Sequence, residues 1–337
     1  MDARLRMVKR RLLGATALLA ALLGLVILSL LLGARAIPVP DILHALWNPD
    51  PADPLTAVIW DRRLPRTILA VVAGAAMGIA GALIQALTRN PLADTGVLGI
   101  NSGAAFSAVL AFSLLGVTSA PGFLAFAILG ALAAGVLVYV IGRGRSVGVD
   151  PLRLVLAGVA LSAILEGVGE GMALVDPQAF DRLRSWMVGN LDVGSFRPIM
   201  TVSIGLLVGI LVLLPGLTSL NSLALGDDMA TALGVSVRRT RVLMLLSITI
   251  SAASATAAAG VMVFLGLMVP HLARWVGGSD QRSVLVLSAI IGPVVLLAAD
   301  IIGRLILPGE LPAGVVVAFV GAPFLIMFAR RRGVITL

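Results

Sequence analysis

The chain contains no cysteine, and only 12% of its 337 residues are charged. The absence of cysteine excludes disulfide bonds and thiolate metal sites. Soluble domains carry about 25% charged residues, so this low share, together with a mean hydropathy of +1.07, indicates a membrane protein. The polar segments reach only roughly 30 residues, too short to fold as separate domains. We therefore expect one all-α, polytopic transmembrane domain over residues 1–337.

The common catalytic and ligand-binding motifs are also missing. No G-x-x-x-x-G-K-[ST] segment occurs, which excludes ATP hydrolysis through a P-loop, and no H-E-x-x-H segment occurs. His44 and His271 are far apart in the sequence, and for His271 we expect a structural role. No basic, aromatic-interleaved surface points to nucleic acid. The chain is thus expected to be no enzyme, with no metal site or cofactor of its own.

Ten apolar stretches are candidates to cross a bilayer. The first follows a basic N-terminus and runs for 22 residues, longer than the core of about 7–15 residues in a signal peptide, so we expect an uncleaved span. Residues 241–277 could form one long helix or two crossings. Both chain ends are basic, which predicts that both are cytoplasmic and that the number of crossings is even. The predicted spans are 12–32, 64–87, 93–117, 122–141, 151–175, 198–217, 241–260, 263–277, 284–307 and 311–328.

Lysine and arginine are distributed unevenly across this map. Of the 25 such residues, 17 fall on the predicted inner side and 8 on the outer side, as the positive-inside rule requires. Within the second span, Gly74, Gly78 and Gly81 share one helix face. Small residues let membrane helices approach closely, so we expect a compact bundle.

The polar stretch 223–241 lies between two spans, on the predicted inner side. Asp227 and Asp228 stand where a short helix begins, because carboxylates favour a helix N-terminus. Gly234 stands where that helix ends, and Ser236 can cap the next helix. The stretch is either a solvated loop or a docking element for a cytoplasmic partner, and its shape alone leaves both open.

Two pairs of charged residues have helical spacing in or near spans. Glu166 and Glu170 lie four apart in the fifth span, where an intramembrane charge would suit a proton-coupled carrier. Both lie in the last third of that span, so we favour a position at its outer end. Asp300 and Arg304 are also four apart, and a local ion pair is the simplest expectation.

Arginines precede the second span on the face that should be poor in positive charge. Arg62, Arg63 and Arg66 could anchor the span at the interface. Together with Arg304 they could instead form a basic outer surface that pairs with carboxylates of a soluble partner.

Several segments resemble the permease subunits of bacterial iron-siderophore, haem and vitamin B12 ABC importers, the FecCD/BtuC-like family. They run in the family's order over nearly the whole chain. The segments are RLPRTILAVVAGAAMGIAGALIQALTRNPLADTGVLGINSGA (63–104), LALGDDMATALGV (223–235), FLGLMVPHLARWVGGSDQR (264–282), AAD (298–300) and ELPAGVVVAFVGAPF (310–324).

The resemblance implies a subunit of ten helices in which helices two to five and seven to ten form inverted halves. It implies a dimer with a second permease subunit, identical or a sister, around a central path. Two separate ATPase subunits would bind ATP and the cytoplasmic face. A periplasmic or lipid-anchored binding protein would deliver the substrate outside.

The resemblance also implies roles for individual residues. Asn90, Pro91 and Leu92 match the family's cytoplasmic gate loop. Segment 223–236 matches the coupling helices that receive the ATPase subunits. The matching coupling positions are Leu223, Leu225, Gly226, Asp227, Asp228, Ala232, Leu233 and Gly234.

At the outer side, Arg63, Arg66 and Arg304 match arginines that pair with acids on the binding protein. Glu166 and Glu170 match no motif of the family, and their role stays open.

We therefore expect an importer permease that moves a ferric-siderophore type chelate inward across the cytoplasmic membrane by alternating access. Haem or vitamin B12 is the alternative substrate within the family. An ion-coupled secondary transporter that uses Glu166 and Glu170 is the competing hypothesis from another class. A neighbouring ATPase gene and binding-protein gene would favour the importer.

Overall fold

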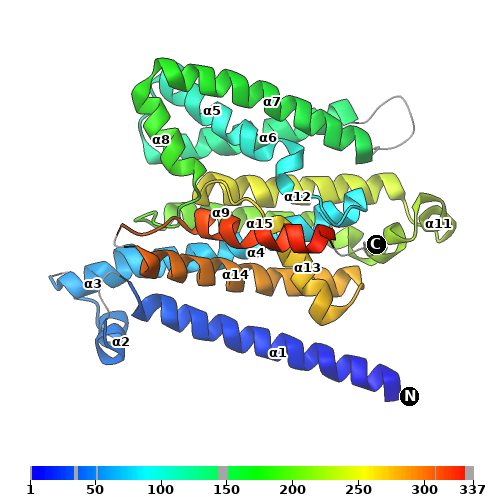
Figure 1. The fold of residues 1–337 in the computed structure, drawn as a ribbon, viewed down its shortest axis with the longest axis horizontal. Helices are drawn as coiled ribbons and strands as arrows, with labels where there is room; N and C mark the ends of the chain where they lie inside the picture. The colour runs from blue at the N-terminus through cyan, green and yellow to red at the C-terminus, as the bar shows by residue number, and fades with distance from the viewer. Residues whose placement is uncertain (1, 34–36, 51, 143–150, 308, 331–337) are drawn as a thin grey trace.

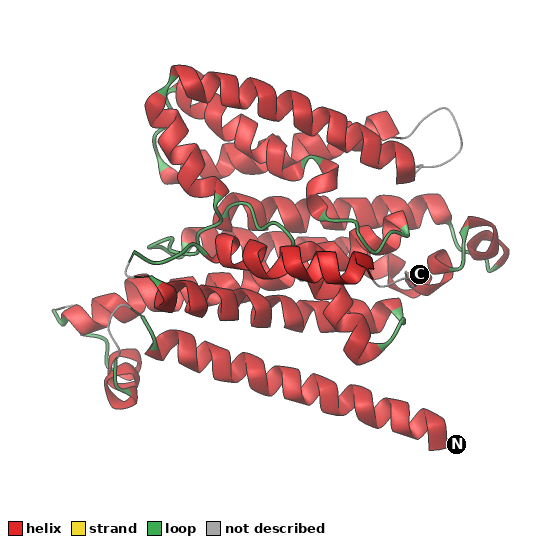
Figure 2. Ribbon diagram, in the orientation of Figure 1, coloured by secondary structure: helices red, strands yellow, loops and turns green. Residues whose placement is uncertain are grey.

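The computed structural model describes residues 2–33, 37–50, 52–142, 151–307 and 309–330. Over these residues the chain is helical, and no strand occurs among them (Figure 2). The long helices run side by side along the long axis of the molecule (Figure 1). This is the all-α bundle that the apolar stretches predict.

The bounds of the elements follow chain order. They are α1 (Asp2–Leu31), α2 (Val39–Trp47), α3 (Pro54–Val58), the π-helical turn η1 (Ile59–Arg63), α4 (Leu64–Thr88), the 3-10 turn η2 (Thr95–Leu98), α5 (Ile100–Leu115), α6 (Ala120–Gly142), α7 (Pro151–Val175), α8 (Pro177–Met187), α9 (Arg197–Leu213), the 3-10 turn η3 (Leu214–Ser219), α10 (Leu220–Ala224), α11 (Asp227–Ala232), α12 (Val237–Ala259), α13 (Leu265–Gly277), α14 (Gln281–Ile306) and α15 (Ala313–Arg330).

Seven helical segments among the described residues are long and apolar enough to cross a membrane. Two shorter apolar helices, Ile100–Leu115 and Ala313–Met327, overlap the third and tenth predicted spans. Helix α13, with 13 residues, overlaps the eighth. The total of ten crossings stays a prediction. The seven segments are Leu13–Leu31, Pro54–Thr88, Ala120–Gly142, Leu152–Met172, Arg197–Ala224, Val237–Ala259 and Gln281–Ile306.

Helix α4 lies at the centre of the bundle and contacts α14, α12, α13 and α9. Its glycine face makes the closest contacts. A Cβ atom on Gly78 would lie 2.3 Å from the carbonyl oxygen of Ser288 in α14, and one on Gly81 would lie 2.0 Å from that of Gly266 in α13. On Gly74 it would lie 2.6 Å from the backbone nitrogen of Pro293. The predicted small-residue face is confirmed, because only glycine permits this separation of the backbones.

The polar stretch 223–236 folds as a short helix between two glycines. Helix α11 begins after Gly226, whose φ of 110° favours glycine. It ends in a Schellman motif, in which the Val235 N–H donates to the Ala230 carbonyl at 3.0 Å and the Gly234 N–H to the Thr231 carbonyl at 2.9 Å. The predicted start and end of this helix are confirmed.

One detail of the same stretch is corrected. Ser236 occupies the N-cap position of α12, but its side chain makes no capping hydrogen bond. Its backbone carbonyl instead accepts the side-chain hydroxyl of Thr240 at 3.0 Å. Residue type alone predicted the position and not the bond.

The two ends of the bundle carry different elements. The N-terminal end of α1, the C-terminal end of α15 and helix α11 lie at one end, whereas α2, α3 and α8 lie at the other (Figure 1). We call these the α11 end and the α8 end. The basic loop with Arg143 and Arg145, the terminal Arg331 and Arg332, the Ala34–Arg35–Ala36 segment and Pro308 lie outside the described residues.

Candidate functional site

At the α8 end, arginines from two helices meet one buried carboxylate. Arg66 Nε in α4 donates to Asp300 Oδ1 in α14 at 2.9 Å. Arg304 Nη2, one turn further along α14, donates to Asp300 Oδ2. The Asp300 side chain has no exposed surface. The expected local pair of Asp300 and Arg304 is confirmed, and Arg66 joins it from 234 residues away.

Arg304 and a third arginine, Arg63, hold the end of α1. Arg63 Nη1 donates to the carbonyl oxygens of Leu30 at 2.6 Å and Leu31 at 2.9 Å. Arg304 Nη1 donates to the Ser29 carbonyl at 2.9 Å, and Arg304 Nη2 to the Ser29 hydroxyl at 2.7 Å. The last carbonyls of a helix lack partners within it and carry partial negative charge. The guanidinium groups therefore close the C-terminal end of α1 and fix it to α4 and α14.

The three arginines are consequently not an exposed cluster, which corrects that expectation. Arg63, Arg66 and Arg304 are 6%, 8% and 6% exposed. Their charge compensates Asp300, Glu310 and the α1 carbonyls, and apart from the local Arg304–Asp300 pair these partners are too distant in the sequence for a charge count to reveal them. The exposed neighbour is Arg62, with 63% of its side chain accessible, and it pairs with Asp192 at 3.0 Å. Docking of a partner at these arginines stays a prediction.

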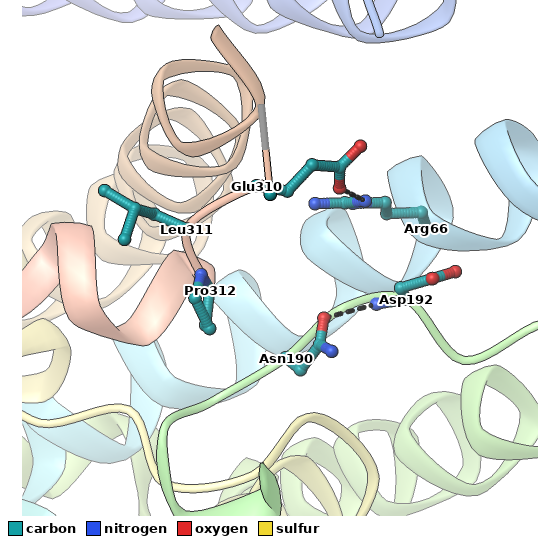
Figure 3. A pocket seen from close by; sticks show the side chains of 7 residues that line it. Arg66, Asn190, Asp192, Glu310, Leu311 and Pro312 are labelled. Atoms are coloured by element: carbon teal, nitrogen blue, oxygen red, sulfur yellow. Dashed lines mark hydrogen bonds and ion pairs between the residues drawn. The ribbon is translucent and has the colours of Figure 1, made fainter. Parts of the chain in front are cut away.

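A pocket of about 270 Å³ opens beside Arg66 (Figure 3). Arg66 Nη1 donates to Glu310 Oε2 at 2.6 Å across one wall. Glu310 has a φ of 51°, an uncommon value for a residue with a side chain. On the opposite wall the Asp192 N–H donates to Asn190 Oδ1 at 2.9 Å. The lining residues are Arg66, Asn190, Asp192, Gly309, Glu310, Leu311 and Pro312.

At the α11 end, a second carboxylate forms ion pairs with two arginines. Asp227, the first residue of α11, accepts from Arg89 Nη2 and from Arg241 Nη2, the latter at 2.9 Å. Arg89 Nε also donates to the Leu223 carbonyl in α10 at 3.1 Å. Arg89 follows the last residue of α4, and Arg241 lies in α12. One side chain of α11 thus joins two long helices.

The predicted gate residues form a tight turn directly after Arg89. The Leu92 N–H donates to Asn90 Oδ1 at 2.9 Å, and the Ala93 N–H donates to the Asn90 carbonyl at 3.1 Å. Pro91 is buried, whereas Leu92 is 41% exposed. The structure therefore brings the gate turn next to the coupling segment, although their roles stay predictions.

Behind this turn, Gln85 ties the end of α4 to α13. Its Nε2 donates to the Leu267 carbonyl at 3.1 Å, and its Oε1 accepts from Arg274 Nη1 at 2.7 Å. His271 Nδ1 lies 2.8 Å from the same Leu267 carbonyl, in a buried position. These contacts suit the structural role expected for His271. Across the described chain, no three His, Asp or Glu side chains gather in a group that could hold a metal ion.

The coupling segment exposes an apolar face. Leu225, Met229 and Leu233 are 66%, 53% and 58% exposed. Met229 lies in α11, and Leu225 and Leu233 flank that helix at its two ends. Exposed apolar groups that cluster on one face mark an interaction site. By contrast, Ala230 on the other side of the helix is fully buried.

The two glutamates of the fifth span lie in the α8-side part of α7. Both are exposed in the isolated chain, and Glu166 Oε1 accepts the Ser102 hydroxyl of α5 at 2.6 Å. A bond to a neutral hydroxyl leaves the carboxylate charge uncompensated by this partner. Their role stays open.

Three contributors to these sites were not predicted from the sequence. Ser29, Glu310 and Arg89 each act through a partner more than 130 residues away in the chain. Only Arg89 carried a usable signal, because it directly precedes the gate residues Asn90 and Pro91.

Comparison with known proteins shows what this architecture belongs to. The model of the FecCD transport family matches residues 20–331. The ferric enterobactin transport system permease protein FepD of Escherichia coli (strain K12) is 47% identical over 305 residues, covering 90% of this chain and 91% of that protein. The hemin transport system permease protein HmuU of Yersinia pestis is 34% identical over 296 residues, covering 86% and 88%.

A solved structure agrees with the sequence relatives. A metal-chelate type ABC transporter in an inward-facing conformation superposes with a TM-score of 0.81 at 26% identity, covering 93% of this chain and 97% of that one. The family match spans far more than half of the chain, and the fold agrees with it. The chain therefore belongs to the FecCD transport family and is a multi-pass permease subunit of an ABC importer, not an enzyme.

Proposed function

We propose that this permease imports a ferric siderophore, with ferric enterobactin as the first substrate to test. The observation that supports it is the 47% identity to FepD over nearly the full length of both chains. The haem-transporting relative is less similar, at 34% identity. The direct test is uptake of iron-55 ferric enterobactin, in competition with unlabelled haem, in cells that lack their own enterobactin permeases. Uptake of haem alone would refute the siderophore assignment.

The apolar face formed by Leu225, Met229 and Leu233 is the proposed receptor for the ATPase subunits. Two ATPase subunits bind ATP and engage the two α11 helices of a permease dimer, which consists of two copies of this chain or of this chain and a sister. Because the chain has no P-loop, ATP hydrolysis belongs to these partners. Their movement displaces α11 and switches the central path between its two sides. Co-purification of the ATPase subunit with Met229→Ser measures this contact, and an unchanged yield of the complex would contradict it.

The proposed orientation places both termini and α11 in the cytoplasm. It is supported by the 17 to 8 distribution of lysine and arginine, and by the N-terminal end of α1 and the C-terminal end of α15 lying at the same end of the bundle as α11 (Figure 1). The cysteine-free chain allows single cysteines at Ala232 in α11 and at Met187 in α8, both of them exposed positions. An impermeant thiol reagent added to whole cells should label residue 187 and spare residue 232. The opposite pattern would overturn the orientation.

The proposed landing site of the binding protein is the α8 end around the Arg66 pocket. Arg63, Arg66 and Arg304 belong to it in different ways. Arg66 lines the pocket, whereas the other two arginines hold the framework beneath it. Acidic side chains on the partner can approach the exposed Arg62 beside this pocket.

Docking at this end is best tested at its exposed residue. Arg62→Glu should slow association with the binding protein at low salt, and the difference should shrink as salt screens the charges. If the wild type and Arg62→Glu associated with the binding protein at the same rate at low salt, Arg62 would not belong to the docking surface.

A further inference from the structure

The C-terminal end of α4 is bound to the coupling segment through one side chain. Arg89 donates through Nε to the Leu223 carbonyl at 3.1 Å and through Nη2 to the Asp227 carboxylate. Asp227 of α11 thus forms ion pairs with Arg89 at the end of α4 and with Arg241 in α12. A displacement of α11 acts directly on the guanidinium group of Arg89.

The backbone conformation of Arg89 links that contact to the position of the gate turn Asn90–Leu92. Arg89 has a φ of 48° and a ψ of 32°, the left-handed conformation, at the C-cap of α4. A residue with a side chain adopts this conformation at a cost, and keeps it only where the surroundings hold it. Asn90, the first gate residue, follows at once, and its N–H donates to the Gln85 carbonyl at 3.2 Å. The direction in which the chain leaves α4 therefore depends on Arg89.

We propose that Arg89 is the positioning residue that transmits movement of α11 to the gate turn Asn90–Leu92. Asp227 is its partner on α11. This inference rests on the proposed coupling function and assigns the residue that carries it. Arg241 has a complementary part: its side chain is 7% exposed and holds the Asp227 carboxylate against α12, whereas the Arg89 side chain is 33% exposed.

The substitution Arg89→Gly tests the contribution of the side chain separately from that of the backbone conformation. Glycine adopts the left-handed conformation without strain, so the turn can form while the link to Leu223 and Asp227 is lost. The conservative variant Arg89→Lys keeps a positive charge within reach of Asp227. Arg239→Ala is the matched control, because Arg239 is an exposed arginine in the first turn of α12 at the same end of the molecule.

The full transporter, with its ATPase subunits and binding protein, is reconstituted in proteoliposomes for each variant. Two quantities are measured: the yield of the ATPase complex and the substrate transported per ATP hydrolysed. For Arg89→Gly we expect the normal yield of complex and about a tenfold lower ratio of transport to hydrolysis, in the range of typical coupling between sites. Arg89→Lys should restore part of the wild-type ratio of transport to hydrolysis. Arg239→Ala should match the wild type in both quantities.

A second readout follows the gate turn itself. Leu92→Cys introduces the only thiol, at an exposed position of the turn. In the Leu92→Cys background the labelling rate should change when ATP is trapped, and the added Arg89→Gly should abolish that change. Asp227→Asn should also abolish the labelling change, and combining it with Arg89→Gly should add little to that effect, because both variants remove the Arg89–Asp227 ion pair.

The outcomes separate this inference from the proposed function. A wild-type chain that binds no ATPase subunit would refute the proposed coupling function itself. A wild-type complex that is coupled, with Arg89→Gly retaining both its transport ratio and its ATP-dependent labelling change, would overturn the role of Arg89 alone. Loss of the ATPase complex in Arg89→Gly would also overturn it, because the residue would then serve docking and not transmission.

Discussion

Neutralising Asp300 should destabilise this permease severely. Its carboxylate is fully buried and accepts from Arg66 and Arg304, so Asp300→Asn leaves two buried cations without their shared anion. Removing one partner of a buried ion pair costs about 3–5 kcal/mol. At roughly 2 °C per kcal/mol, the lower end for large domains, the melting temperature should fall by about 6–10 °C.

The assay is thermal denaturation of the purified protein in detergent, followed by the loss of the monodisperse peak in size-exclusion chromatography. The matched control is Arg62→Ala, which breaks the exposed pair with Asp192. Exposed pairs contribute about 0.2–1 kcal/mol, which corresponds to no more than about 2 °C. If Asp300→Asn melted within 2 °C of Arg62→Ala, the buried network would not hold α1, α4 and α14 together as described.

Three further predictions concern other parts of the molecule. Gly78→Ala should lower the melting temperature, because its Cβ would lie 2.3 Å from the Ser288 carbonyl oxygen and overpacking costs about 1–3 kcal/mol. The control Gly24→Ala should leave the melting temperature unchanged, because open space surrounds Gly24. Equal melting temperatures of the two variants would refute the close α4–α14 contact. Gly234→Pro should lower transport per ATP while the protein still inserts, because it removes the N–H that closes α11, and normal coupled uptake would contradict this. Glu166→Gln combined with Glu170→Gln should keep more than about half of the uptake, because coupling to ATP needs no titrating carboxylate; complete loss at normal expression would favour an ion-coupled carrier.

The sequence predicted features that depend on local or periodic patterns. The glycine face of α4 follows from spacing, because residues three and four apart lie on one side of a helix. The start of α11 follows from the acids Asp227 and Asp228, and its end from the conformational preference of Gly234. In each case the physical cause lies within a few residues of the position it affects.

Features that depend on distant partners were not predictable in the same way. The positive-inside rule places Arg63, Arg66 and Arg304 on one side of a membrane, and it does not distinguish exposed from buried cations. Their burial follows from Asp300 and from the last carbonyls of α1, which reach them only in the folded bundle.

The same limit applies at the α11 end. No periodicity links Arg89 to Asp227 across 138 residues, and the left-handed backbone of Arg89 is visible only in the structure. The sequence did show that Arg89 and Asp227 lie in two segments that resemble the family, 63–104 and 223–235.

We conclude that this chain forms the membrane path of an importer driven by ATP through separate subunits. The most direct test reconstitutes the permease with its ATPase subunits and binding protein in proteoliposomes and measures uptake of iron-55 ferric enterobactin, with and without ATP, in the presence and absence of a protonophore. The account predicts uptake that requires ATP and the binding protein and that the protonophore leaves unchanged. Uptake by the permease alone, driven by a proton gradient without ATP, would contradict it.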